Sequence, residues 1–261
     1  MTSRRTYRAD GVVVKAYGDA ARAARAATIL EELERLGVPA PRLVRIASTE
    51  VAMTDVGEPS DDASEEVYRV LGELTGRLHA TPAPGMPEAT FSLAAERARA
   101  ATTLAFAREH RLEHLDLIDN ELLAAFAELR DLDALPRGLI HTDIGPHNSV
   151  VDARGVRTLV DWDDAGLGAC VIDIGYTLVH AAVDIETGEP RWLPELARAF
   201  LAGYREHRAL TPEELAALPD AMALGSLIYV IADWVPAIHV REWARASWVR
   251  GRFITLKLSF A

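Results

Sequence analysis

The stretch LIHTDIGPHNSVVDARGVRTLVDWDDAG, residues 139–166, decides how the whole chain is interpreted. It sets two histidines and five aspartates between short apolar runs. Residues 148–152 and 156–161 are typical of two strands joined by a short turn, which makes a hairpin. Because a hairpin brings its outer ends together, Asn148 and Asp161 are expected to be neighbours, although 13 positions separate them.

Further carboxylates flank this hairpin. Asp143 lies in the loop before the first strand, and Asp163 and Asp164 follow the second. Two carboxylates and an amide oxygen at strand ends suit Mg²⁺, and another carboxylate beside the metal can accept a proton from a hydroxyl. Phosphoryl transfer needs these parts and a cation for the nucleotide phosphates. Zinc is not indicated, because the chain has neither a cysteine cluster nor an HExxH motif.

Lys15 is the candidate cation. It and Lys257 are the only lysines among 28 basic residues. Lys15 stands in GVVVKAYGD, an apolar run with β-branched residues that reads as a buried strand. The alternative is an edge strand from which the lysine reaches solvent.

The chain before residue 58 predicts a small sheet with one helix, which we take as a nucleotide-binding lobe of residues 1–57. Asp10 and Gly11 supply the tight turn of a first hairpin. Gly37 suits the end of the helix. The elements are expected at residues 6–17 (the hairpin), 19–37 (the helix), 42–48 and 50–56 (two strands).

Residues 58–261 read as a mostly helical lobe that carries the catalytic loop, the metal site and the acceptor site, with 58–64 as the linker. Its helices are expected at about 62–80, 92–110, 116–133, 171–184, 192–207 and, in pieces, 212–248. TPEEL begins the last region with Thr211 as N-cap and Glu214 completing a capping box.

Charge and composition narrow the function. The net charge is −11, with +2 in residues 1–57 and −13 in the rest. Nucleic acid is therefore not an expected partner, whereas a cationic small molecule is an expected one. The single cysteine, Cys170, excludes an internal disulfide. No run suits a membrane span, the first residues do not read as a secretory signal, and the cytoplasm is the expected compartment.

HTDIGPHN (141–148) and LVDWDDAGLG (159–168) resemble the catalytic loop and the metal-binding segment of the aminoglycoside phosphotransferase and choline kinase-like family. VVVKAY, VPAPRLV, VAMTDVGE and LTGRLHA resemble further segments of that family in the expected order. The resemblance implies an α+β fold of the two-lobed protein-kinase-like type, ATP and Mg²⁺ as cofactors, and phosphoryl transfer to a hydroxyl.

The resemblance also implies a role for each matching residue. Asp143 would be the catalytic base, and Asn148 and Asp161 would bind Mg²⁺, with Asp163 as a further candidate. Lys15 would contact the α and β phosphates. The hinge would hold adenine through the backbone of Thr54, Asp55 and Val56, with Met53 against the base. Asp173 would brace the catalytic loop by accepting backbone N–H bonds, supported by His141. His147 and His79 are expected to be a solvated loop residue and a packed helix residue.

Two departures from the family pattern concern the small lobe. Only 14 residues precede Lys15, which is too few for a first strand and a full glycine-rich loop. The helix glutamate that pairs with the lysine in relatives falls at Ala26 or Ala27, and Glu31 or Glu32 could replace it only with a shift of register.

Three functions remain open from the sequence. The chain is an ATP-dependent kinase, a kinase completed by a partner chain or second copy through the edge of the small sheet, or a non-catalytic binding protein. The acidic helical lobe favours an amine-bearing acceptor such as an aminoglycoside, another basic antibiotic or an amino alcohol. Trp234, Trp243 and Trp248 are either an aromatic wall for that amine or core residues.

Overall fold

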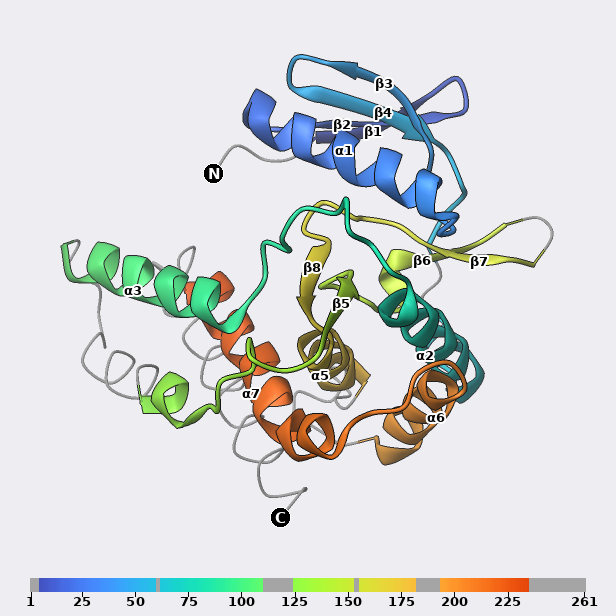
Figure 1. The fold of residues 1–261 in the computed structure, drawn as a ribbon. Coiled ribbons are helices and arrows are strands. Elements are labelled where there is room, and N and C mark those ends of the chain that lie inside the picture. Colours follow the sequence, from blue (N-terminus) through green and yellow to red (C-terminus); the bar gives the residue numbers. More distant parts are fainter. Residues whose placement is uncertain (1–4, 60–61, 110–123, 153–154, 182–192, 235–261) are drawn as a thin grey trace.

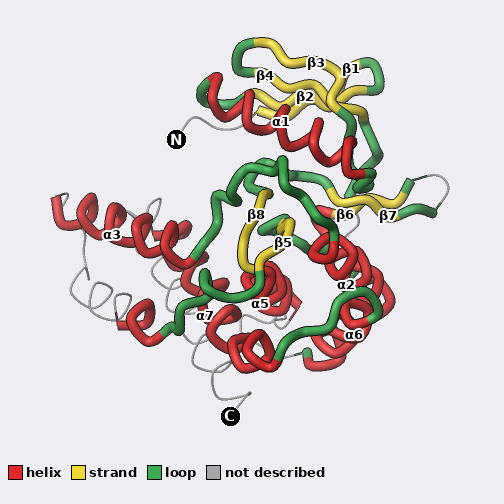
Figure 2. Tube along the Cα trace, viewed as in Figure 1, coloured by secondary structure: helices red, strands yellow, loops and turns green. Residues whose placement is uncertain are grey.

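The computed structural model of the chain describes residues 5–59, 62–109, 124–152, 155–181 and 193–234. A four-stranded sheet with one helix forms one part, and a larger, mostly helical part lies beside it (Figure 1). Figure 2 shows that one of the two remaining strand pairs lies among the helices and that the other extends outward next to the small sheet. The α+β class and the two-part layout are confirmed. A boundary at residue 57 remains our proposal.

The small sheet has the order β1-β2-β4-β3 with antiparallel neighbours. Asp10 and Gly11 join the first two strands with φ of 51° and 76°, as a tight two-residue hairpin turn requires. The expected hairpin is therefore confirmed, and its turn is too short for a glycine-rich loop. The strands are β1 (Arg5–Ala9), β2 (Val12–Ala16), β3 (Leu43–Ala47) and β4 (Glu50–Thr54).

Helix α1 (Ala20–Leu36) lies between this sheet and the helical part (Figure 1). Asp19 caps its start by accepting the N–H of Arg22 at 2.9 Å. Gly37 ends it with φ of 70°, a left-handed conformation that glycine adopts without strain. The small and apolar residues on one face of α1 are buried, and the helix packs against β3 and β4, so tertiary packing stabilises it.

The helical part is organised by two close helix pairs, α2 with α6 and α5 with α7. In the first pair a Cβ on Gly72 would lie 2.0 Å from the backbone oxygen of Phe200, so only glycine permits this approach. In the second, a Cβ on Gly175 would lie 2.5 Å from Ala221. The helices are α2 (Glu65–Ala80), α3 (Leu93–Glu109), α5 (Cys170–Ala181), α6 (Pro194–Arg205) and α7 (Pro212–Trp234).

Two short strand pairs place the loops of the candidate site. The expected hairpin is confirmed as β6 (Ser149–Val151) and β7 (Arg157–Leu159), preceded by the 3₁₀ turn η1 (Pro146–Asn148). The pair β5 (Arg137–Ile140) and β8 (Gly166–Ala169) was not predicted. Its second strand, GLGA, lacks the β-branched and aromatic residues by which strands are recognised.

The expected helices agree with the structure where it describes them, except that the helix expected at 116–133 ends at residue 128. Thr211 and Glu214 form the predicted capping box at the start of α7, through bonds of 2.9 Å and 3.2 Å. Parts of the helices expected at 116–133, 171–184, 192–207 and 212–248 fall outside the described residues. No described helix is both long and apolar enough to cross a membrane.

Candidate active site

The loop between β5 and β6 holds the candidate base, Asp143. Asn148 Nδ2 donates to Asp143 Oδ2 at 2.8 Å and to its backbone oxygen at 2.9 Å. His147 Nε2 lies 3.3 Å from Asp143 Oδ1, and this hydrogen bond raises the pKa of His147. The structure therefore brings Asp143 and Asn148 together as expected. His147, expected only as a solvated loop residue, contacts the candidate base.

Asp173 on α5 fixes the start of this loop. Its carboxylate accepts the backbone N–H of His141 at 2.9 Å and that of Thr142 at 2.6 Å. Thr142 has φ of 78°, an unfavourable conformation for a threonine that persists only where neighbours hold it. The geometry is the one that the family resemblance implied for Asp173.

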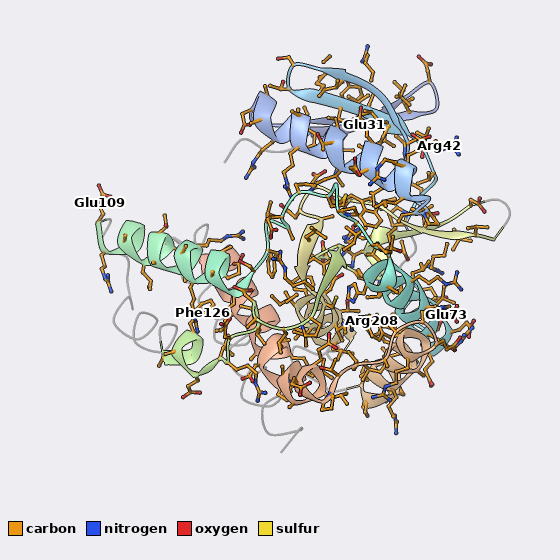
Figure 3. All side chains as sticks on the ribbon, viewed as in Figure 1. Glu31, Arg42, Glu73, Glu109, Phe126 and Arg208 are labelled. Atoms are coloured by element: carbon orange, nitrogen blue, oxygen red, sulfur yellow. The ribbon has the colours of Figure 1, made fainter. Side chains whose placement is uncertain are left out.

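A buried polar network continues from Asp173 into the helical part. His79 Nε2 lies 3.1 Å from the Asp173 carboxylate, and His79 Nδ1 lies 3.0 Å from the hydroxyl of Tyr204. Burial alone would lower the pKa of His79, but the neighbouring Cys170 and Asp173 outweigh it and raise that pKa. Arg208 donates to the Tyr204 hydroxyl at 2.7 Å (Figure 3 labels Arg208). His79 is thus more than a packed helix histidine.

His141 joins the catalytic loop to the metal-binding segment. Its Nε2 lies 2.9 Å from the backbone oxygen of Val160, and its Nδ1 accepts the backbone N–H of Asp143 at 3.3 Å. The ring packs edge-on against Trp162, with 4.5 Å between ring centroids. His141 has no free ring nitrogen, which agrees with a supporting role.

Lys15 crosses from the small sheet to the helical part. Its Nζ lies 2.6 Å from Asp161 Oδ1 and 3.1 Å from Asp163 Oδ2. Burial would lower the pKa of Lys15, but the two carboxylates outweigh it and raise that pKa. Lys15 stands on an interior strand between β1 and β4, so the alternative of a solvent-directed lysine on an edge strand is wrong.

Helix α1 offers no carboxylate to Lys15. Ala26 lines the cavity beside the lysine, and Ala27 is buried. Glu32 hydrogen-bonds Arg35 at 2.6 Å on the same helix. Glu31 is exposed (Figure 3). The shift of register that would have supplied a helix glutamate therefore does not occur.

A cavity of about 430 Å³ lies between the small sheet and the β6–β7 hairpin. At its hinge edge the Thr54 N–H donates to Arg42 O at 2.9 Å, and the Asp55 N–H donates to Gly11 O at 3.1 Å. Of the three expected hinge donors, Val56 N–H is the one left for a ligand by the described residues. Site residues expected from the sequence that line the cavity are Lys15, Met53, Thr54, Asp55, Val56, Asn148, Asp161 and Asp163.

The donor atoms at one end of the cavity fit a hard divalent cation. Asn148 uses its amide nitrogen on Asp143, so the amide oxygen is the atom it can offer to a cation. The side chain of Asp161 is 39% exposed, and its φ of 64° is a strained backbone conformation for an aspartate. Carboxylate and amide oxygens are the ligands that Mg²⁺ takes.

Asp143 also lies next to an acidic and partly buried region around Tyr176. Tyr176 on α5 has its pKa raised by burial and by the carboxylates of Asp143, Glu96 and Asp164 around it. Glu96 is fully buried, and among the described residues neither of its carboxylate oxygens has a hydrogen-bond partner. Arg99 lies 3.2 Å from one of these oxygens without hydrogen-bond geometry. The charge of this region is therefore incompletely compensated.

Several of these contacts were missed by sequence reasoning. Tyr17 donates to Asp163 at 2.7 Å, and its position two residues after Lys15, just past the end of the strand, was a usable signal because side chains alternate along an extended chain. Arg25 on α1 donates to the backbone oxygens of Glu88 and Ala165, at 2.8 and 2.7 Å, and nothing local in the sequence marks it. Of the three tryptophans considered for the acceptor, Trp243 and Trp248 lie outside the described residues, as does the side chain of Trp234.

Lys15 on an interior strand pairs with Asp161, which follows a short hairpin. Next to them, Asp173 on a helix holds the loop that carries Asp143. Together these features define a phosphotransferase of the two-lobed kinase-like class. The model of the "Phosphotransferase enzyme family" matches residues 2–210, and the chain belongs to this family. The expectation of an enzyme that transfers a phosphoryl group to a hydroxyl is thereby confirmed.

The known proteins to which this chain is similar are named for different acceptors. Homoserine kinase of Beijerinckia indica is 28% identical over 240 residues, which cover 84% of this chain and 71% of the relative. The macrolide 2'-phosphotransferase MphH of Brachybacterium faecium has 19% identity and a TM-score of 0.60, over 94% of this chain and 87% of its own. Amicoumacin kinase hAmiN, solved with AMP-PNP and Ca²⁺, has 18% identity and a TM-score of 0.63, over 95% and 84%. ATP and Mg²⁺ are the cofactors typical of the family.

Proposed function

We propose that the chain transfers the γ-phosphoryl group of ATP, with Mg²⁺, to a hydroxyl of a small amine-bearing acceptor. The observation that carries this proposal is the position of Asp143. Its carboxylate is held by Asn148, a residue of the nucleotide-sized cavity, and it also lies beside Tyr176 in the acidic region. A base in that position can serve a donor on one side and an acceptor on the other.

Each candidate residue has a defined part in this proposal. Asp143 orients the acceptor hydroxyl and takes its proton. Asn148 and Asp161 are the residues that would hold Mg²⁺, which neutralises charge on the phosphates when bound. Lys15 lies near enough to Asp161 to reach the same phosphates. Val56 offers a free backbone N–H to the adenine, and Met53 lines the cavity beside it.

The acidic region supports an acceptor with a positive charge. Glu96 and Asp164 both act on Tyr176, which itself lies against the base. An ammonium group on the acceptor would compensate charge that the described residues leave unbalanced. Five curated relatives are homoserine kinases, so an amino acid with a side-chain hydroxyl is the first candidate within this class.

A basic antibiotic is the second candidate acceptor. Solved structures with the same fold include a macrolide phosphotransferase, an aminoglycoside phosphotransferase and a choline kinase. These solved structures are less than 25% identical to this chain, so their similarity supports the fold and not the acceptor. A homoserine-like acceptor is therefore the first candidate.

The test is ATP consumption against a panel of hydroxylated amines, with the product mass measured. The panel holds homoserine, serine, choline, ethanolamine, an aminoglycoside and a macrolide. We expect one class to gain the mass of one phosphoryl group, and we expect no gain without Mg²⁺. Asp143→Asn is the matched negative control. Transfer to none of these acceptors, with ATP bound normally, would exclude the amine-bearing class.

A further inference from the structure

The two carboxylates that contact Lys15 have different surroundings. The side chain of Asp161 is 39% exposed, whereas that of Asp163 is 9% exposed. Asp163 uses Oδ2 on Lys15 and Oδ1 on the hydroxyl of Tyr17, at 3.1 and 2.7 Å. Both oxygens of Asp163 are therefore engaged, whereas Asp161, which lines the same cavity, is the more exposed of the two.

A lysine that contacts phosphates needs a partner that keeps its long, flexible side chain in place. Asp161 cannot be that partner throughout, because in the proposed function its carboxylate is a ligand of the metal. Helix α1 cannot supply one, because its residues that line the same cavity are Ala26 and Leu30, which carry no carboxylate. Asp163 remains as the buried carboxylate within hydrogen-bond distance of Lys15 Nζ.

We propose that Asp163 is the positioning residue of Lys15, fixed in turn by Tyr17, and that it replaces a helix carboxylate in this role. The inference rests on the proposed function. In this arrangement the carboxylate that positions Lys15 comes from the segment that also carries Asp161, and not from α1. Helix α1 still contacts that segment, but through Arg25 and the backbone oxygen of Ala165. Asp163 is accordingly not a metal ligand.

The first test is Asp163→Asn, which keeps the shape and removes the charge. We expect the KM for ATP to rise roughly 10- to 100-fold, the range for a lost hydrogen bond to a charged group. The KM for the acceptor and the Mg²⁺ concentration for half-maximal activity should not change. Calorimetry should show the same loss in affinity for ATP without any acceptor present. Tyr17→Phe should act in the same direction but more weakly, and serves as the second variant if Asp163→Asn does not fold.

A rescue experiment separates positioning from general damage. Asp163→Asn combined with Ala26→Glu places a carboxylate on the face of α1 that lines the cavity. We expect the double variant to recover part of the lost ATP affinity, which a merely structural role of Asp163 would not allow. Glu31→Gln, on the exposed side of α1, is the control and should leave ATP affinity unchanged.

The outcomes distinguish this inference from the proposed function. A wild-type chain that binds no Mg·ATP contradicts the proposed function itself. A wild-type chain that binds it while Asp163→Asn keeps its ATP affinity overturns the positioning role alone. A variant that needs much more Mg²⁺ instead would make Asp163 a metal ligand and also overturn it.

Discussion

Asp173 accepts the backbone N–H of His141, 32 residues earlier in the chain, at a distance of 2.9 Å. The same carboxylate accepts the N–H of Thr142 and lies against His79, so one buried side chain joins α5, the catalytic loop and α2. Since Asp143 follows Thr142 directly, the position of the candidate base depends on this carboxylate.

The hydrogen bonds that Asp173 accepts from the catalytic loop predict the effect of Asp173→Asn. An amide offers one acceptor oxygen in place of two, so in either orientation its NH₂ group would face a backbone N–H, that of Thr142 or that of His141. We expect the free energy of unfolding to fall by about 2–4 kcal/mol, because a buried donor loses its partner. Urea unfolding measures this loss, and turnover should fall with it. An unchanged unfolding midpoint would mean that the loop is held by other contacts.

Asp143→Asn tests the candidate base. The variant keeps the size of the side chain and an acceptor for Asn148 but cannot take a proton. We expect turnover to fall roughly 10²- to 10⁴-fold, the usual contribution of a general base. Thermal unfolding and ATP affinity should be close to those of the wild type. Near-normal turnover would remove Asp143 from this role.

Asp161→Ala tests the proposed metal ligand. Removing a ligand from a site with few protein ligands should abolish Mg²⁺-dependent binding of ATP. Titration calorimetry with and without Mg²⁺ measures this directly. Because Lys15 keeps Asp163, we expect weak binding of ATP without Mg²⁺ to persist in the variant. Equal Mg·ATP affinity in variant and wild type would contradict the assignment.

The sequence predicted those parts of the site that follow from local geometry. Asn148 and Asp161 are brought together by a hairpin, whose strands and turn are local patterns. The first hairpin, α1 and the glycine that ends α1 could be predicted for the same reason. The position of Lys15 on a strand follows from the β-branched residues before it, and the structure makes that strand an interior, half-buried one.

The unpredicted parts depend on contacts between distant segments. The pairing of Lys15 with Asp163 joins residues 148 positions apart. It depends on how the small sheet and α1 pack against the segment that carries Asp163, and no spacing in the sequence indicates it. The β5–β8 pair forms because the chain returns after the metal segment, although GLGA has low strand propensity. Burial of Glu96 cannot be read from α3, whose sequence looks like that of an ordinary surface helix.

Glu96 gives a prediction about pH and stability. Burial raises its pKa to about 7, with a smaller contribution from Asp164, while Arg99 acts in the opposite direction. The ordinary value is 4.5. Between these two values the folded chain keeps a proton on Glu96 that the unfolded chain has lost. The free energy of unfolding therefore falls as the pH rises from 4.5 to 7, by about 3 kcal/mol in full.

Glu96→Gln removes this dependence, because glutamine stays neutral at every pH. We expect the variant to match the wild type at pH 4.5, where Glu96 is largely protonated in the folded chain, and to be more stable by about 1–3 kcal/mol at pH 8. Urea unfolding at both values measures the difference. Glu213→Gln, in the exposed first turn of α7, is the matched control and should show no such gain. If Glu96 also binds the ammonium group of the acceptor, the same variant should raise the KM for the acceptor and leave that for ATP unchanged. A variant that is less stable than the wild type at pH 8 would mean that Glu96 is ionised and paired in the folded protein.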